Sequence, residues 1–249
     1  MKDVHDLRAR TRHVEAIAAV FLPDEDKPKR HLLKTLKPVL KVAGEVRDMD
    51  VLGVKVRTLA RRREDHSVTR LLEHLQAMRL ESAAELVETV ARKQKDACRS
   101  LKQFSKLIEG RLHAKHARAA TGTNAHEPGV GAANKLMDEL CRWPAFNAEN
   151  LHAFRIKVKE LRNVLRLTRD ANPEFVNTLE QVKTRIGDWH DWHQLKEIAK
   201  KVLAGKANRA ALREIEEIAS TRFNRALASA YGLRSRYLSG YSGPTIAEP

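Results

Sequence analysis

Hydrophobic positions recur at steps of three and four along most of the chain, and very little of it alternates with the period of a strand. These positions predict helices over about 3–22, 28–43, 45–63, 67–118, 134–142, 151–170, 174–186, 188–203 and 207–230. Gly44 and Gly187 are expected to end the helices that precede them, because glycine often occupies the position after a helix. The stretch 67–118 contains no proline and is expected to form one very long helix or a helical hairpin. The pattern therefore predicts an all-α fold.

The stretch 151–167 carries a row of basic side chains beside its apolar stripe. Leucine, valine and phenylalanine at steps of three and four form the stripe, and the basic residues follow the same steps one position later. This row, called here the second ladder, consists of His152, Arg155, Lys159, Arg162 and Arg166. The helix is thus expected to bury one side and to present cations on the adjacent side.

The start of the chain repeats this design. The segment VHDLRARTRHVE matches LHAFRIKVKELR, and it carries a first ladder of His5, Arg8 and Arg12. A second pair of segments, VAGEVRDMDVL and RIGDWHDWHQL, places Gly44 over Gly187 and Asp48 over Asp191, with Arg47 over His190. Two matches in the same order, separated by one small insertion or deletion, predict an internal repeat.

The repeat suggests one domain built from two halves. We expect a single domain over 1–249, with a first half-repeat at 1–118, a linker at 119–133, a second half-repeat at 134–232 and a loose tail at 233–249. The linker contains TGTNAHEPGVGA, a run rich in residues that favour turns. The first half shows no counterpart of the helix expected at 134–142.

The composition is strongly basic. The formal net charge is +15, and such an excess favours an anionic partner and salt-sensitive association. Lysines scattered over the surface would indicate only that they keep the protein soluble. Cations stacked on one helix face repel each other, however, unless something negative lies there. The two cysteines form no framework and no run is apolar enough for a membrane span, so we expect a cytoplasmic protein without membrane insertion.

Few patterns point to catalysis or to a resident metal. His113 and His116 share a helix face, and His190 lies near Asp191 and His193, but no cysteine pair or HExxH motif accompanies them. GxSxG and P-loop motifs are missing from the sequence. We therefore expect no reaction, no metal and no cofactor.

The remaining hypothesis is that helix faces of this protein bind an anion. The stretch 28–43 adds its own basic stripe, and arginine, lysine and histidine all suit phosphate oxygens. If the two ladders face each other, they form a positive channel. If they do not, they are two ordinary amphipathic helices with solvated cations. The acidic residues Glu45, Asp48 and Asp50 are expected to stabilise the start of helix 45–63, or to orient a basic side chain.

These motifs resemble the CHAD family, the conserved histidine α-helical domain. The resemblance rests on His5-x-x-Arg8-x-x-x-Arg12, Gly44-x-x-Arg47-Asp48, His152-x-x-Arg155-x-x-x-Lys159-x-x-Arg162 and Gly187-x-x-His190-Asp191. It implies two pseudo-symmetric helical bundles around a central basic pore. It also implies non-catalytic binding of inorganic polyphosphate, with an association with polyphosphate granules in the cell.

The predicted site follows from the ladders and the resemblance together. Residues expected to bind polyphosphate are His5, Arg8, Arg12, Lys34, Lys37, Lys41, Arg47, His152, Arg155, Lys159, Arg162, Arg166 and His190, with Asp48, Asp50 and Asp191 as orienting carboxylates. Nucleic acid is the alternative partner, although aromatic residues make up only 5% of the chain and none lies within the basic stripes to stack on bases. A polyphosphate-processing enzyme is the third hypothesis. The oligomeric state and the preferred polymer length stay open.

Overall fold

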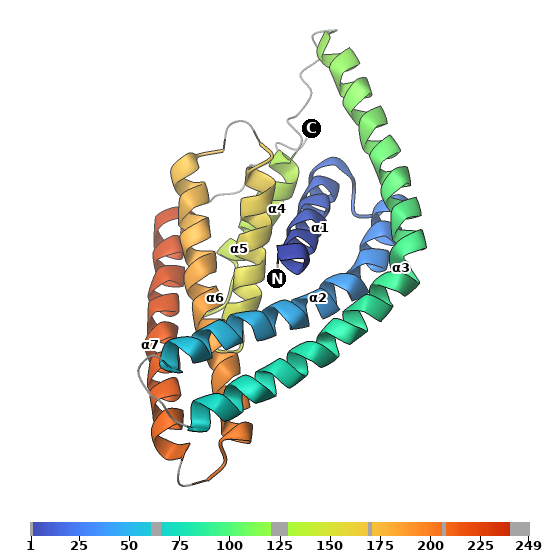
Figure 1. Cartoon of the computed structure of the whole chain (residues 1–249). Coiled ribbons are helices and arrows are strands. Elements are labelled where there is room, and N and C mark those ends of the chain that lie inside the picture. Colours follow the sequence, from blue (N-terminus) through green and yellow to red (C-terminus); the bar gives the residue numbers. More distant parts are fainter. Residues whose placement is uncertain (1, 61–65, 121–128, 169–170, 206–207, 240–249) are drawn as a thin grey trace. The chain divides into compact units, whose positions relative to one another are not determined.

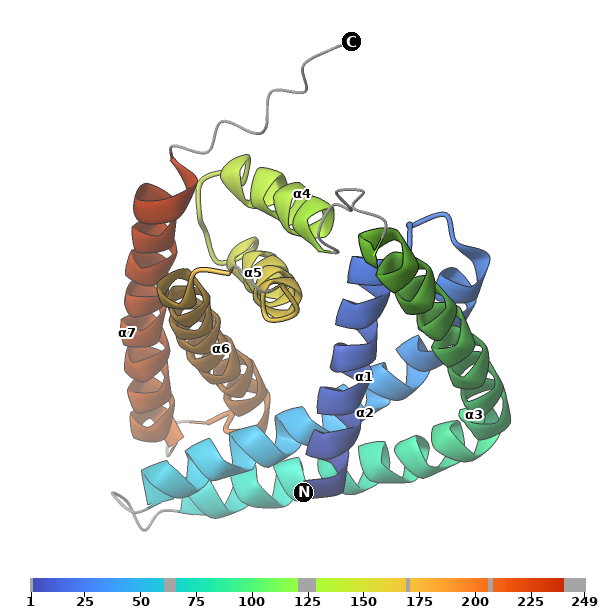
Figure 2. The same cartoon turned by 90° about the horizontal axis from the view of Figure 1, so that it is seen from above.

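The computed structural model describes residues 2–60, 66–120, 129–168, 171–205 and 208–239 (Figures 1 and 2). Helices account for nearly all of them, and this part of the chain contains no strand. The helices are α1 (Lys2–Phe21), α2 (Lys27–Ala60), α3 (His66–Ala120), α4 (Val130–Cys141), α5 (Leu151–Leu165), α6 (Pro173–Val202), α7 (Arg209–Leu233) and the short π-helix η2 (Arg234–Leu238). The all-α prediction is confirmed.

Two predicted helix ends are wrong. The helices expected at 28–43 and 45–63 are one helix, α2, and those expected at 174–186 and 188–203 are one helix, α6. Gly44 and Gly187 lie inside these helices, and neither has a positive φ. A glycine inside a helix costs only about 1 kcal/mol relative to alanine, so packing against a neighbouring helix outweighs it. Glu45, Asp48 and Asp50 therefore do not stabilise a helix start.

Other boundaries also differ from the predicted ones. The stretch expected as a helix or hairpin at 67–118 is the single 55-residue helix α3. Within the linker expected at 119–133, residues 119–120 belong to α3 and 130–133 belong to α4, while 121–128 lie outside the described residues. Residues 234–238, expected in a loose tail, are helical, and residues 240–249 lie outside the described part.

The chain divides into two compact units. Unit 1 contains residues 1–62 and 72–128, and unit 2 contains residues 63–71 and 129–249. The first turn of α3 belongs to unit 2, where Ser67 donates a hydrogen bond to Asn208 and Arg70 donates to the carbonyl of Val202. The remainder of α3 belongs to unit 1.

Unit 1 is held together by apolar side chains of α1, α2 and α3. One cluster joins Ala18 and Leu22 with Leu32 and Leu36 of α2 and Phe104 of α3. A second cluster, centred on Val39, Val42, Ala43, Val46 and Leu86, packs Val4 and Leu7 of α1 against α2. Burying these side chains fixes the face of α1 that meets α2, and so fixes where the first ladder points.

Unit 2 packs α5 against α6 and α6 against α7, which lie side by side in both views (Figures 1 and 2). Four residues of the predicted apolar stripe of α5 are buried, Leu151, Phe154, Val158 and Leu161, whereas the fifth, Leu165, is only half-buried and Val164 is buried beside it. The start of α6 is fixed by Asn172, whose side chain accepts hydrogen bonds from the backbone of Glu174 and Phe175, with Pro173 in the first helical turn. The second ladder therefore lies on a well-anchored helix beside α6.

Candidate anion-binding site

Each ladder carries one arginine that lies over a glycine of the next helix. In unit 1 a Cβ atom added to Gly44 would lie 2.6 Å from Nη1 of Arg8. In unit 2 a Cβ atom added to Gly187 would lie 2.9 Å from Nε and 3.0 Å from Nη2 of Arg155. The two glycines that the sequence match aligns are thus both positions where only the absence of a side chain admits an arginine.

Both arginines also reach a backbone carbonyl at the same relative position. Arg8 donates to the carbonyl of Leu40 at 3.5 Å, and Arg155 donates to that of Lys183 at 3.2 Å. Each acceptor precedes its glycine by one helical turn. These contacts, called here the Arg–Gly contacts, hold each guanidinium against the backbone of α2 or α6. Glycine serves here for close approach between helices and not for helix termination.

Three further cations gather around Arg155 in unit 2. Arg162 of α5 and Arg166, the residue directly after α5, continue the second ladder, and Lys183 faces them from α6. Burial together with the positive charges of Arg162, Arg155 and Arg166 lowers the pKa of Lys183 to about 8. Burial and the neighbouring Arg166 lower the pKa of Arg162 as well. We name Arg155, Arg162, Arg166 and Lys183 the cation cluster.

One carboxylate enters this cluster. Glu180 of α6 forms ion pairs with Arg162 and with Lys183. The side chain of Arg162 is only 13% exposed, while that of Glu180 is 42% exposed. Among the described residues, the Nε atom of Arg162 is buried without a hydrogen-bond partner. This single carboxylate offsets only part of the charge of the four cations in the cluster.

His190 of α6 lies against His152, the first residue of the second ladder. The rings of His152 and His190 lie 3.8 Å apart, between centroids. Burial, and then the charges of His152 and Arg155, lower the pKa of His190 to about 4. Burial and Arg155 also lower the pKa of His152. Both imidazoles are therefore neutral at pH 7, and a bound anion would favour their protonation.

The predicted cations of unit 1 are more dispersed. Arg12 is paired with Glu15 of its own helix at 2.7 Å, and Lys41 lies 3.9 Å from Glu45. His5, Lys34, Lys37 and Lys41 are exposed, whereas Arg8 and Arg47 are half-buried. The residues that unit 1 brings together are therefore Arg8 and the backbone around Gly44.

The predicted orienting carboxylates differ in what they contact. Asp50 pairs with Arg79 of α3 at 2.7 Å, and its side chain is only 5% exposed. It therefore orients a residue outside the ladders and joins α2 to α3. Asp48 and Asp191 are half-buried and both make polar interactions.

Sequence reasoning missed Lys183 and Glu180. Both share a face of α6 with Gly187 and His190, at steps of three and four residues. The predicted break of α6 at Gly187 hid this face, because it assigned Lys183 and His190 to different helices. A continuous helix through Gly187 would have placed Lys183 beside the second ladder.

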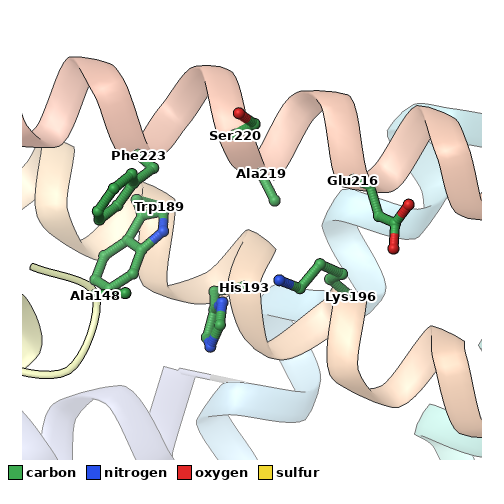
Figure 3. A pocket seen from close by; sticks show the side chains of 8 residues that line it. All are labelled: Ala148, Trp189, His193, Lys196, Glu216, Ala219, Ser220 and Phe223. Atoms are coloured by element: carbon green, nitrogen blue, oxygen red, sulfur yellow. The ribbon is translucent and has the colours of Figure 1, made fainter.

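Unit 2 also contains a pocket of about 330 Å³ between α6 and α7 (Figure 3). Trp189, His193 and Lys196 line it from α6, facing Glu216, Ala219, Ser220 and Phe223 of α7. It contains none of the cation cluster, and its lining includes a carboxylate. A polyanion is therefore better matched by the cluster than by this pocket. Within the described residues, no three His, Cys, Asp or Glu side chains gather in a way that could hold a metal ion.

Comparison with known proteins identifies a family for this chain. A model of the CHAD domain family matches residues 1–200. No curated protein and no solved structure matches the chain. No helix in the described ranges is both long enough and apolar enough to cross a membrane. Because the family match covers most of the 249 residues, the chain belongs to the CHAD domain family.

Proposed function

We propose that this protein binds inorganic polyphosphate, without a reaction of its own, through the cation cluster and the adjoining histidines of unit 2. The observation that carries the proposal is the convergence of Arg155, Arg162 and Lys183 from two helices, where burial and then the neighbouring positive charges lower the pKa of Lys183 to about 8. Because the positive side chains of the cluster repel one another, a ligand with several negative charges stabilises them. Polyphosphate supplies about one negative charge per unit along a flexible chain.

The chemistry of the side chains fits a phosphate polymer. Guanidinium groups donate two parallel hydrogen bonds to phosphate oxygens, and a lysine ammonium adds a point charge. The Arg–Gly contact fixes Arg155 before the ligand arrives, so little side-chain entropy is lost on binding. Family membership supports the same ligand, since the CHAD resemblance implies polyphosphate. It also implies that the ladder of α1 contributes to one basic pore and that the protein associates with polyphosphate granules, and both ideas form part of the proposal.

The first experiment is a calorimetric titration with long-chain polyphosphate at moderate salt. We expect saturable binding by the parent protein, and losses of about tenfold in Arg155→Ala and in Arg8→Ala, the order of one charge-assisted hydrogen bond. Arg236→Ala is the matched control, because its guanidinium is exposed and pairs with Glu174 instead of lying in the cluster. Equal affinity in all four proteins, each folded by circular dichroism, would refute the proposed site.

Two further assays separate the competing functions. In a competition at equal phosphate concentration, duplex DNA should fail to displace polyphosphate. Displacement by DNA would favour nucleic acid as the partner. Incubation of the protein with polyphosphate, with and without divalent cations, should release no orthophosphate. Release that disappears in Arg155→Ala would instead establish a polyphosphate-processing enzyme.

A further inference from the structure

Glu180 bridges two cations of the cluster. Its two carboxylate oxygens contact cations from two helices: Oε2 pairs with Arg162 of α5 and Oε1 pairs with Lys183 of α6. Thr184 also donates to Oε1, at 3.4 Å. A phosphate group bridging the same two cations would present its oxygens in much the same way, because carboxylate and phosphate are bound by the same donors.

We propose that Glu180 is an internal competitor of the phosphate ligand, occupying the position between Arg162 and Lys183 until polyphosphate displaces it. This inference rests on the proposed function and adds a specific phosphate subsite to it, together with a residue that weakens binding there. In the unliganded protein Glu180 separates and partly neutralises two cations that would otherwise repel each other. When a phosphate arrives, the carboxylate must leave, since two anions cannot share the position.

The exposure of the three side chains supports this exchange. Arg162 and Lys183 are 13% and 22% exposed and stay within the cluster, while Glu180 is 42% exposed. Glu180 can therefore turn into water once a phosphate group has replaced it between the two cations, which are themselves held in the cluster. The remaining positive charge on Arg155 and Arg166 favours a ligand with more charge than one carboxylate carries.

Unit 1 lacks this arrangement. In the sequence match that aligns Gly44 with Gly187, the position of Glu180 is taken by Lys37, and that of Lys183 by Leu40. The competing carboxylate is thus a feature of α6 and not of every basic helix in the chain. Its effect should appear in the affinity of unit 2 for phosphate.

The test compares Glu180→Gln with Glu197→Gln. Both substitutions remove one carboxylate from α6, but Glu197 pairs with Lys196 and Lys200, far along the helix from the cluster. In calorimetric titrations with polyphosphate of defined length, Glu180→Gln should bind about fivefold more tightly than the parent, as expected when a charge a few ångström from the ligand is removed. Glu197→Gln should match the parent within about twofold, because exposed charges at that distance are screened.

The outcomes are distinguishable. If the parent does not bind polyphosphate, the proposed function fails. If the parent binds and Glu180→Gln is no tighter than Glu197→Gln, the internal competitor is refuted while the proposed function stands. Should Glu180→Gln fold poorly, Glu180→Asp keeps the charge and loses one methylene of reach. It should also bind more tightly than the parent, and unchanged or weaker binding in this variant would refute the inference.

Discussion

The pair α1–α2 and the pair α5–α6 have the same contact at their centre and different charges around it. In each pair an arginine of the ladder lies over a glycine and donates to the carbonyl one turn before that glycine. Around Arg155 the cations Arg162 and Lys183 converge from two helices. In α1–α2, by contrast, Arg12 pairs with Glu15 of its own helix, and the predicted binding lysines of α2, Lys34, Lys37 and Lys41, are exposed.

The difference separates two roles that the ladder motif combines. The Arg–Gly contact is a packing device, which fixes one guanidinium on a helix backbone in both units. The strength of anion binding depends instead on how many cations are brought together and how well water is kept from them. On this view unit 2 holds phosphate most tightly, and the cations of α2 add mainly long-range attraction.

The largest expected effect comes from removing two positive charges from α5, compared with removing two from α2. Arg155→Ala with Arg162→Ala should weaken polyphosphate binding about 100-fold, since two charge-assisted hydrogen bonds are lost from a partly buried site. Lys34→Ala with Lys37→Ala removes the same net charge from exposed positions and should cost about threefold. Calorimetry measures both. Equal losses would remove the distinction between the two regions.

The second prediction compares how much a buried carboxylate of unit 1 and a more exposed carboxylate of unit 2 contribute to the free energy of unfolding. Asp50→Asn should lower the free energy of unfolding by about 2 kcal/mol, because it disrupts a buried ion pair with Arg79. Asp188→Asn removes the partner of Arg222 at a more exposed position, and should cost about 0.5 kcal/mol or less. Urea titrations followed by circular dichroism give both values. A large loss of polyphosphate affinity in Asp50→Asn would show that Arg79 belongs to the binding site.

The two glycines beneath the ladder arginines should also respond differently to substitution by alanine. An alanine at Gly187 would push against Nε, Cζ and Nη2 of Arg155, so the whole guanidinium must move and its bond to Lys183 is lost. We expect a net destabilisation of about 1 kcal/mol, after the gain in helix propensity. At Gly44 the closest contact is with the flexible tip of Arg8, which can swing away. Gly44→Ala should therefore be neutral or stabilising by about 0.5 kcal/mol. A larger loss of stability in Gly44→Ala than in Gly187→Ala would contradict this assignment.

The smallest expected effect is the pH dependence of stability in unit 2. The pKa of His190 is about 4 in the folded protein and near 6.5 in the unfolded chain. Between these values the unfolded chain binds the extra proton, so stability is highest above pH 6.5 and falls as the pH drops towards 4. With solvent screening, we expect less than about 1 kcal/mol between pH 7 and pH 5. His190→Gln should remove this part of the dependence in urea titrations, and an unchanged slope would show that His190 is not responsible.

Much of this fold could be predicted from the sequence, because its signals are local. The helical spacing of apolar residues gives the all-α class, and the same spacing gives the buried stripe of α5 and the cations beside it. The continuity of α2 and α6 could not be predicted in this way. A glycine followed by acidic residues looks like a helix end, and the side chain that explains Gly44 or Gly187 lies on another helix.

The parts of the site that were missed depend on the same kind of long-range contact. Lys183 joins the cluster only because α6 continues through Gly187 and packs beside α5. Asp50 was expected among the ladder cations, but its partner Arg79 lies on α3, in a different region of the sequence. The pseudo-symmetry of two bundles around a pore stays a prediction. Residue types and spacing indicate which cations exist, whereas the packing of helices decides which of them meet.

A crystal structure of the protein grown with polyphosphate would reveal which cations hold the phosphate groups. We predict phosphate groups bound to Arg155, Arg162 and Lys183, with the carboxylate of Glu180 turned away from both of its present partners. Phosphate bound only to the exposed lysines of α2, with Glu180 still paired to Arg162, would contradict the account.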